Sequence, residues 1–345
     1  MRYKFFTSSL RSWQAMWDAI KEAQESVYLE MYIFKDDMPP FDFLNLLGEK
    51  AKQGVRVRVI LDSFGSAGLS KEAVAGLREA GGQLFFFSRF FYRMHRKILI
   101  TDEGRVFIGG VNLSERFKFW NDLVVELTDQ RIVARAVHSF ARVYFDCGGR
   151  DPLVLDKNPK VHTGGRAHNW FVEHLPFRNK FKLKELYRSH ISQAQKSIVL
   201  VTPYFAPKRW LVAALHHPVL RGVNVEVLVP KATDYFFTDR VNFYYMYKLT
   251  NLGINFYVES HMNHAKLMLL DEGEGMVGSN NLDFLSFDLN SEVGVFIKDA
   301  GAIEKLWSIV KNWKAGAVKF DPKTYKPKLL DYILSPLFRL FARIF

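Results

Sequence analysis

Two stretches of the chain show the same succession of hydrophobic and polar positions. Residues 20–34 (IKEAQESVYLEMYIF) and residues 191–205 (ISQAQKSIVLVTPYF) each read as the end of an amphipathic helix followed by a buried strand. Residues 54–61 (GVRVRVIL) and 222–229 (GVNVEVLV) each open on a glycine and then alternate apolar and polar positions, which is typical of a half-buried strand. The two pairs are offset by 171 and 168 residues. This nearly constant offset predicts two copies of one structural unit.

Strands that alternate with helical segments predict an α/β fold. We expect two fused domains related by a pseudo-two-fold axis, each a mixed, largely parallel sheet flanked by helices. The predicted domains span residues 1–155 and 169–318, and they are joined by a polar linker rich in Asp, Lys, Pro and Gly at about residues 151–168. A basic, apolar tail follows at residues 319–345.

Composition narrows the class of protein. Hydrophobic residues make up 48% of the 345 residues and charged residues 24%, which is the balance of a globular protein and not of a disordered one. The formal net charge of +12 favours a polyanionic partner, namely nucleic acid, an anionic lipid surface or a phosphorylated substrate. The single cysteine, Cys147, excludes an internal disulfide and a cysteine-rich metal site. The N-terminus lacks the apolar run of a signal peptide, and no stretch reaches the roughly 18 apolar residues of a membrane span, so a soluble or peripheral protein is expected.

A third repeated element carries the candidate chemistry. It is a His-x-Lys-x4-Asp motif, followed after six residues by Gly-x-x-Asn. The offset between the copies is 169 at every position, so the motif is in register with the wider repeat. Its polar residues are His95, Lys97, Asp102 and Asn112 in the first copy and His264, Lys266, Asp271 and Asn281 in the second.

This spacing suits the recognition of a phosphate. On a strand, a histidine and a lysine two positions apart point to the same face. A side-chain amide after a glycine turn can donate a hydrogen bond to an anion. Two such sets, brought together by the pseudo-two-fold axis, would surround one phosphate with two lysines and two asparagines. One histidine could then attack phosphorus while the other protonates the leaving oxygen, a scheme that needs neither a metal nor a cofactor.

These motifs resemble those of the phospholipase D superfamily, and most closely its bacterial cardiolipin synthase branch. The resemblance runs from about Trp13 to about Trp313 and includes the flanking segments 93–97 and 281–292. Many family members carry arginine at the position of Leu285, so this chain departs from the commoner pattern there.

The resemblance implies two phospholipase D-like domains and a covalent phosphohistidine intermediate. By the family pattern, His95 is the nucleophile and His264 the general acid and base, although the sequence alone leaves this assignment open. Family members also orient each motif histidine with a downstream acid, for which Asp122 and Glu292, 27 and 28 residues after their histidines, are the candidates. Asp102 and Asp271 belong to the catalytic motif, but we expect them to stabilise its fold.

The resemblance further implies phosphatidyl transfer from an anionic phospholipid to an alcohol or lipid acceptor, with cardiolipin as the preferred product. Hydrolysis of phospholipids and cleavage of nucleic acid are the alternatives, and nucleic acid is the less favoured partner. Exposed Phe90 and Phe91 beside arginines, or a short apolar helix at residues 336–345, would suit a membrane surface, while burial of either in the core is the competing interpretation. We expect a monomer, peripherally associated with the cytoplasmic face of a bacterial inner membrane.

Overall fold

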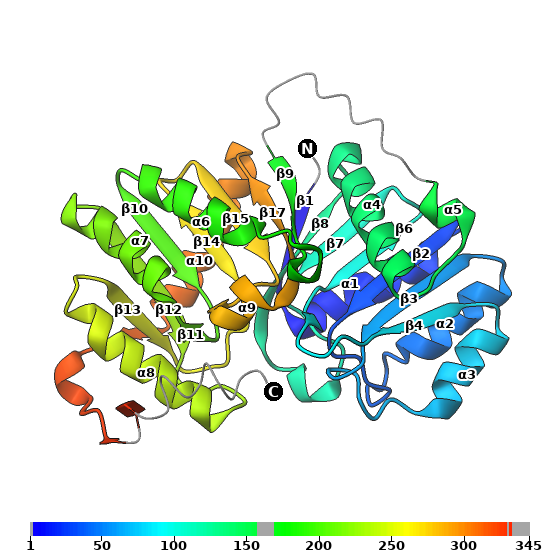
Figure 1. Ribbon diagram of the computed structural model, residues 1–345, viewed down its shortest axis with the longest axis horizontal. Coiled ribbons are helices and arrows are strands. Elements are labelled where there is room, and N and C mark those ends of the chain that lie inside the picture. Colours follow the sequence, from blue (N-terminus) through cyan, green and yellow to red (C-terminus); the bar gives the residue numbers. More distant parts are fainter. Residues whose placement is uncertain (1–2, 157–168, 330, 333–345) are drawn as a thin grey trace.

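The computed structural model describes residues 3–156, 169–329 and 331–332, and it forms two α/β halves that lie side by side (Figure 1). The predicted repeat is confirmed, because each half presents the same order of strands and helices. In the first half, residues 20–34 span the end of a helix and strand β2 (Ser26–Met31), and residues 54–61 cover most of strand β3 (Arg56–Asp62). Gly54 and Gly222 open the corresponding strands of the two halves with φ of 88° and 83°, a conformation that favours glycine.

The N-terminal half is built on a seven-stranded mixed sheet in the order β1-β8-β7-β6-β2-β3-β4. Its strands are β1 (Tyr3–Ser8), β2 (Ser26–Met31), β3 (Arg56–Asp62), β4 (Gln83–Phe87), β6 (Ile98–Thr101), β7 (Arg105–Gly109) and β8 (Asn121–Leu127). Its helices are α1 (Ser9–Glu22), α2 (Phe43–Lys52), α3 (Lys71–Glu79), α4 (Gln130–Asp146), α5 (Pro152–Leu155) and the short 3-10 helix η1 (Glu115–Phe117).

The C-terminal half repeats this plan in a nine-stranded sheet of order β18-β13-β12-β10-β14-β15-β17-β5, with β9 also paired to β17; β5 (Arg93–Met94) comes from the N-terminal half. Its own strands in this sheet are β9 (Asn169–His174), β10 (Ser197–Val201), β12 (Asn224–Pro230), β13 (Asn255–Glu259), β14 (Leu267–Leu270), β15 (Glu274–Gly278), β17 (Asn290–Ile297) and β18 (Ala317–Lys319). A separate small sheet pairs β11 (Phe205–Ala206) with β16 (Leu282–Asp283). Its helical segments are η2 (Pro176–Arg178), α6 (Lys182–Gln193), α7 (Arg209–Leu220), α8 (Phe236–Thr250), α9 (Phe284–Asp288), α10 (Ala300–Ala315) and η3 (Pro322–Thr324).

Both sheets are mixed, as predicted, but the expectation that they are largely parallel is wrong. In the N-terminal sheet only β2–β3 and β3–β4 pair in parallel, and the other four neighbouring pairs are antiparallel. The C-terminal half repeats this with β10, β12 and β13. The reason is that helices connect only the early strands of each unit. Later strands such as β6 and β7 are joined by a tight turn, which requires antiparallel pairing.

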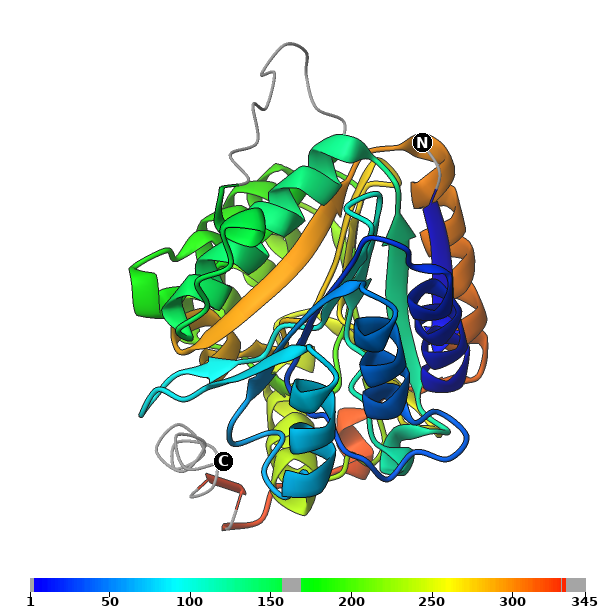
Figure 2. The ribbon, with the colours of Figure 1, turned by 90° about the vertical axis from the view of Figure 1, so that its right-hand side faces the viewer.

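The two halves share a hydrophobic core. One cluster of buried residues combines the facing sides of both sheets with helices α4 and α10. Each of these helices packs beside the first strand of the other half: Arg142 of α4 pairs with Glu173 of β9 at 2.8 Å, and Lys305 of α10 lies 5.2 Å from the ring of Tyr3 in β1. Figure 2 shows α10 in orange beside β1 in blue. A shared core of this kind fixes the relative position of the two halves.

Short backbone pairings also cross between the halves. Strand β5 (Arg93–Met94) of the N-terminal half pairs in parallel with Asn290 and Ser291 of β17. The pseudo-symmetric contact is a bridge between Asn121 and Asn263, in which the backbone N–H of His264 donates to the carbonyl of Asn121 at 2.7 Å. The residues that precede each motif histidine are therefore held by the opposite half.

The described part of the tail packs on helix α8. Tyr325 stacks on Phe243, and Asp331, which is buried, pairs with Arg240 and accepts a hydrogen bond from Tyr325 at 2.7 Å. The helix predicted at residues 336–345 and most of the predicted linker lie outside the described residues. Among the described helices, none is both long enough and apolar enough to cross a membrane.

Candidate active site

The two His-x-Lys segments meet where the halves join. His95 and Lys97 lie in an irregular segment between β5 and β6, and His264 and Lys266 lie in the equivalent segment before β14, so the prediction that these residues lie within strands is wrong. Each lysine amino group folds back onto the carbonyl of its own motif histidine, at 2.8 Å for Lys97. All four residues are at least 94% buried.

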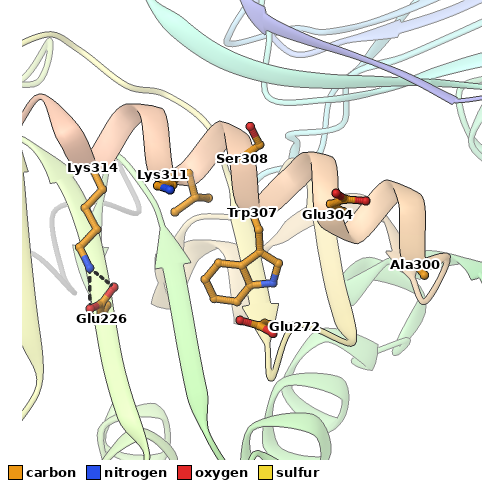
Figure 3. A pocket seen from close by; sticks show the side chains of 9 residues that line it. Glu226, Glu272, Ala300, Glu304, Trp307, Ser308, Lys311 and Lys314 are labelled. Carbon is orange, nitrogen blue, oxygen red and sulfur yellow. Dashed lines mark hydrogen bonds and ion pairs between the residues drawn. The ribbon is translucent and has the colours of Figure 1, made fainter.

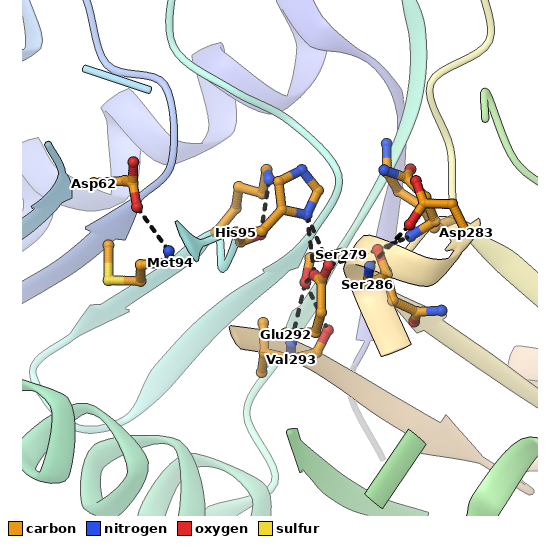
Figure 4. Close-up of polar contacts among 12 residues, drawn as sticks. Asp62, Met94, His95, Ser279, Asp283, Ser286, Glu292 and Val293 are labelled. Atoms are coloured by element: carbon orange, nitrogen blue, oxygen red, sulfur yellow. Dashed lines mark hydrogen bonds and ion pairs between the residues drawn. The ribbon is translucent and has the colours of Figure 1, made fainter. Parts of the chain in front are cut away.

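The histidine and acid partners are exchanged between the halves. Nδ1 of His95 lies 3.0 and 3.1 Å from the two carboxylate oxygens of Glu292, and Nδ1 of His264 lies 2.8 Å from Asp122 (Figure 4 shows the first pair). Asp122 and Glu292 do contact the motif histidines, but neither binds the histidine that precedes it in its own copy. The crossed backbone pairings at β5 and at Asn121 bring each histidine to the strand that carries the opposite acid.

The two acids have unequal surroundings. Glu292 is fully buried and accepts hydrogen bonds from the hydroxyls of Ser279 and Ser286, the latter at 2.8 Å. Burial opposes its charge, but His95, Lys97 and Ser279 outweigh burial and hold the pKa of Glu292 below its usual range. At Asp122, burial dominates over Lys266 and raises the pKa to about 7.

Burial also shifts the basic groups. It lowers the pKa of His95 to about 4, although Glu292 acts in the opposite direction. It lowers the pKa of His264 well below the usual range, assisted by the charges of Lys266 and Lys97. The pKa of Lys266 falls to about 8, and that of Lys97 is also strongly lowered, in both cases chiefly by burial. Burial thus disfavours the charged forms of these four bases, and a bound phosphodiester anion would favour them.

The two motif asparagines are also buried, and each is 5% exposed. The side-chain oxygen of Asn112 accepts from the backbone N–H of Ile33 at 3.3 Å, which turns its amide group to donate elsewhere. The backbone N–H of Asn281 donates to Ser286 at 2.9 Å. Ser286 in turn donates to Glu292, so Asn281 is linked through Ser286 to the acid that contacts His95.

The two motif aspartates lie away from this cluster. Asp102 accepts hydrogen bonds from three successive backbone N–H groups, at residues 24–26, over 2.8–3.1 Å. Asp271 does the same with residues 195–197 over 2.7–2.8 Å. Each carboxylate ties the turn after its motif strand to the start of the neighbouring strand. This placement agrees with a role in stabilising the fold.

Comparison with known proteins identifies the family. The sequence profile described as "Cardiolipin synthase, PLD-like domain" matches residues 16–144 and 187–313, once in each half. The chain belongs to this family. It is 31% identical over 346 residues to the probable cardiolipin synthase YwiE of Bacillus subtilis strain 168, covering 94% of this chain and 69% of that protein. It is 32% identical over 354 residues to the major cardiolipin synthase ClsA of the same organism, covering 96% and 71%.

A solved structure supports the fold. The phosphatidylserine synthase of Haemophilus influenzae Rd KW20 superposes with a TM-score of 0.76 at 15% identity, covering 99% of this chain and 93% of that one. The predicted architecture of two fused phospholipase D-like units is thereby confirmed, and the two profile matches fall in the two halves of the family repeat.

Several residues at the candidate active site lie outside the two motifs and were not predicted from the sequence. The ring of Tyr32 lies 4.8 Å from the ring of His95, and the amino group of Lys97 lies 4.9 Å from the ring of Tyr32. The ring of Trp120 stands 5.3 Å from that of His264. Asp62 accepts from the backbone N–H of Met94 at 2.7 Å and so positions the segment before His95 (Figure 4). Asp62 could have been noticed in the sequence, because it is a carboxylate directly after the predicted strand at residues 54–61.

A buried charge network lies directly behind His95. Arg96 and Glu30 are both inaccessible to solvent and approach to 2.7 Å. Arg96 also donates to Ser139 of α4 at 2.8 Å, and Ser139 donates to Glu173 of β9 at 2.5 Å. The network therefore joins the two halves. The glutamate inside the apolar run of residues 20–34 was its signal in the sequence.

This network has no counterpart in the second copy. The repeat offsets place Val201 at the position of Glu30 and Ala265 at that of Arg96, and both are buried apolar residues. Burial raises the pKa of Glu30 to about 7, with Arg96 acting against it. The family repeat is thus chemically asymmetric next to its first histidine.

A cavity of about 530 Å³ lies elsewhere, along helix α10 (Figure 3). Lys314 crosses it to reach Glu226 at 2.6 and 2.7 Å, and Trp307 forms part of its wall. None of the motif residues lines this cavity, so it is separate from the candidate active site. Within the described residues, no group of three or more His, Cys, Asp or Glu side chains is arranged as a metal site.

Proposed function

We propose that this chain is a phosphatidyltransferase of the cardiolipin synthase type that works through a covalent phosphohistidine. The observation that carries the proposal is the pair of crossed histidine–acid contacts, His95 with Glu292 and His264 with Asp122, beside two buried lysines. Membership of the cardiolipin synthase family supports lipid as the substrate class.

In the first step, Nε2 of His95 attacks the phosphorus of an anionic phospholipid. The bond from phosphorus to the leaving alcohol breaks, and His264 donates a proton to that oxygen. Lys97 and Lys266, with the amide groups of Asn112 and Asn281, bind the phosphate oxygens and stabilise their developing charge. In the second step, His264 takes the proton of the acceptor hydroxyl, which attacks phosphorus and releases His95.

The unequal acids support His95 as the nucleophile. A phosphorylated imidazole that keeps the proton on Nδ1 is positively charged, so it gains most from an ionised carboxylate beside it. His95, Lys97 and Ser279 hold the pKa of Glu292 below its usual range, whereas the raised pKa of Asp122 makes it the weaker anion. A bound phosphate anion would raise the pKa of His264 toward the value a proton donor needs.

The proposed donor is an anionic phospholipid such as phosphatidylglycerol, and the proposed acceptor is the hydroxyl of a second lipid, with water as the hydrolytic variant. Both halves of the proposed site come from one chain, which is consistent with a monomer. We further propose peripheral association with the cytoplasmic face of a bacterial membrane.

The test uses purified protein with phosphatidylglycerol in mixed micelles, followed by mass spectrometry of the lipids. We expect cardiolipin and free glycerol, and no product with the His95→Ala variant. Release of phosphatidic acid alone would assign hydrolysis instead. Cleavage of oligonucleotides without any lipid product would contradict the proposal.

A further inference from the structure

Exposed phenylalanines gather at one end of the molecule. Nine phenylalanine side chains are exposed in the described part of the chain, although phenylalanine usually lies inside a fold. Six of these nine lie around the candidate active site, four of them in connections and two at the start of α8. They form what is called here the aromatic rim: Phe64, Phe90, Phe91, Phe119, Phe236 and Phe237.

Topology explains why the aromatic rim surrounds the site. Phe64 follows β3, the Phe90–Phe91 pair lies between β4 and β5, and Phe119 precedes β8. In the second half, Phe236 and Phe237 begin α8, directly after the connection from β12. All of these connections leave the edge of the sheets where the motif histidines lie. Figures 1 and 2 place η1, α8 and the β4–β5 connection at the lower side of the molecule.

Specific contacts connect the rim to the site. The guanidinium group of Arg93, two residues before His95, lies 4.6 Å from the ring of Phe64. Phe119 is followed by Trp120, whose ring packs near His264. Across the site, Arg116 of η1 pairs with Asp234 at 2.7 Å, which brings the start of α8 beside the connection that bears Phe119. The rim is therefore one surface contributed by both halves.

Resting on the proposed function, we propose that the aromatic rim inserts into the interface of an anionic phospholipid bilayer and seats the active site on it. The motif histidines and lysines are almost fully buried, and a membrane seated on this end of the molecule would present the lipid phosphodiester close to them. Phe90 and Phe119 are 86% and 87% exposed, and aromatic side chains of this kind settle at the boundary between headgroups and acyl chains.

Charge around the rim favours an anionic membrane. Arg89 and Arg93 flank the Phe90–Phe91 pair, and neither has an acidic partner among the described ion pairs. Lys118, beside Phe119, pairs with Glu115 at 2.7 Å and so contributes less. Apolar insertion should therefore carry most of the binding, and the two arginines should add a preference for anionic headgroups.

The chain offers a direct probe and a matched control. Its single cysteine can be replaced in a Cys147→Ser background, so that one new cysteine carries an environment-sensitive fluorophore. Phe145 is the control, because it is 48% exposed and also lies beside an arginine, Arg150, at 4.4 Å. Phe145 lies in the last turn of α4, near the start of β3, where Asp151 pairs with Arg58. This is the edge of the sheet opposite to the edge where the motif histidines lie.

Labels are placed in turn at residues 90, 119, 236 and 145, and vesicles of phosphatidylglycerol and phosphatidylcholine are added. We expect a blue shift at the first three positions and none at residue 145. In sedimentation with the same vesicles, the Phe90→Ser/Phe91→Ser variant should bind at least about tenfold more weakly, because two large apolar side chains leave the interface. The Phe145→Ser variant should bind like the parent.

Several results would overturn the proposal. These are an equal shift at residue 145, no shift at any rim position, unchanged binding of Phe90→Ser/Phe91→Ser, or equal binding to vesicles of phosphatidylcholine alone. A shift that grows with protein concentration in the absence of vesicles would assign the rim to a second copy of the chain. Both readouts are independent of turnover, so a protein without transferase activity would refute the proposed function and leave this test intact.

Discussion

Replacing one member of the buried Glu30–Arg96 pair should cost far more stability than replacing both. Both side chains are inaccessible to solvent and lie 2.7 Å apart. In an Arg96→Met variant, Glu30 becomes a buried carboxylate without its cation, and losses of this kind are about 3–5 kcal/mol. Adding Glu30→Leu removes the orphaned charge and fills its space, so the double variant should recover most of that loss. The coupling free energy should reach at least about 3 kcal/mol.

Unfolding in urea, followed by circular dichroism and tryptophan fluorescence, gives the four free energies of the cycle. The loss in Arg96→Met should also depend on pH. The pKa of Glu30 is raised from 4.5 to about 7 even with Arg96 present, so the folded protein holds a proton that the unfolded chain has lost. Stability then falls as the pH rises from about 4.5 through 7, and the Arg96→Met variant should be less destabilised at pH 5 than at pH 8. Additive losses, or a loss in Arg96→Met that is independent of pH, would refute this reasoning.

Four further predictions concern the mechanism and the motif residues. With a substrate that has a good leaving group, the His264→Ala variant should accumulate a phosphatidyl adduct on His95, which peptide mass spectrometry can detect. An adduct on His264 in the His95→Ala variant would instead make His264 the nucleophile. Burial lowers the pKa of Lys266 to about 8, so kcat/KM should fall above about pH 8 as the lysine loses its charge. The Lys266→Arg variant should show this fall at a higher pH. The Lys266→Ala variant should raise the activation free energy of turnover by roughly 3–4 kcal/mol. Activity should survive excess EDTA, whereas a loss that divalent metal restores would contradict the mechanism. Asp102→Ala should lower the melting temperature, because three backbone N–H groups lose their acceptor, and an unchanged temperature would contradict its structural role.

The repeat could be predicted from the sequence because strands and helices each impose a characteristic spacing on the hydrophobic residues. Residues 20–34 and their second copy show the apolar run of a buried strand, and the offset of 169 places the two motifs at equivalent points. The direction of the later strands could not be predicted in this way, because hydrophobic alternation is the same in parallel and antiparallel pairs.

The exchange of acids was also beyond the sequence. Asp122 and Glu292 stand at nearly the same distance after their own histidines, so spacing favours neither pairing. The exchange is decided by the backbone contacts at β5 and Asn121, which join segments far apart in the chain. Ser279 and Ser286 affect the site by donating hydrogen bonds to Glu292. Their spacing in the sequence does not indicate this contact.

The crossed contacts also bear on how such a chain can evolve. Two identical single-copy chains could form the same site as a symmetric dimer, but every substitution would then appear in both histidine–acid pairs at once. Fusion of the two copies into one gene removes that constraint. Here one histidine is paired with Glu292, which two serines support, while the other is paired with Asp122 without them, because Gly110 and Phe117 occupy the places of those serines in the first copy. Covalent linkage therefore allows the surroundings of each histidine to differ permanently, whereas in a symmetric dimer the two identical histidines could differ only through the placement of the bound substrate.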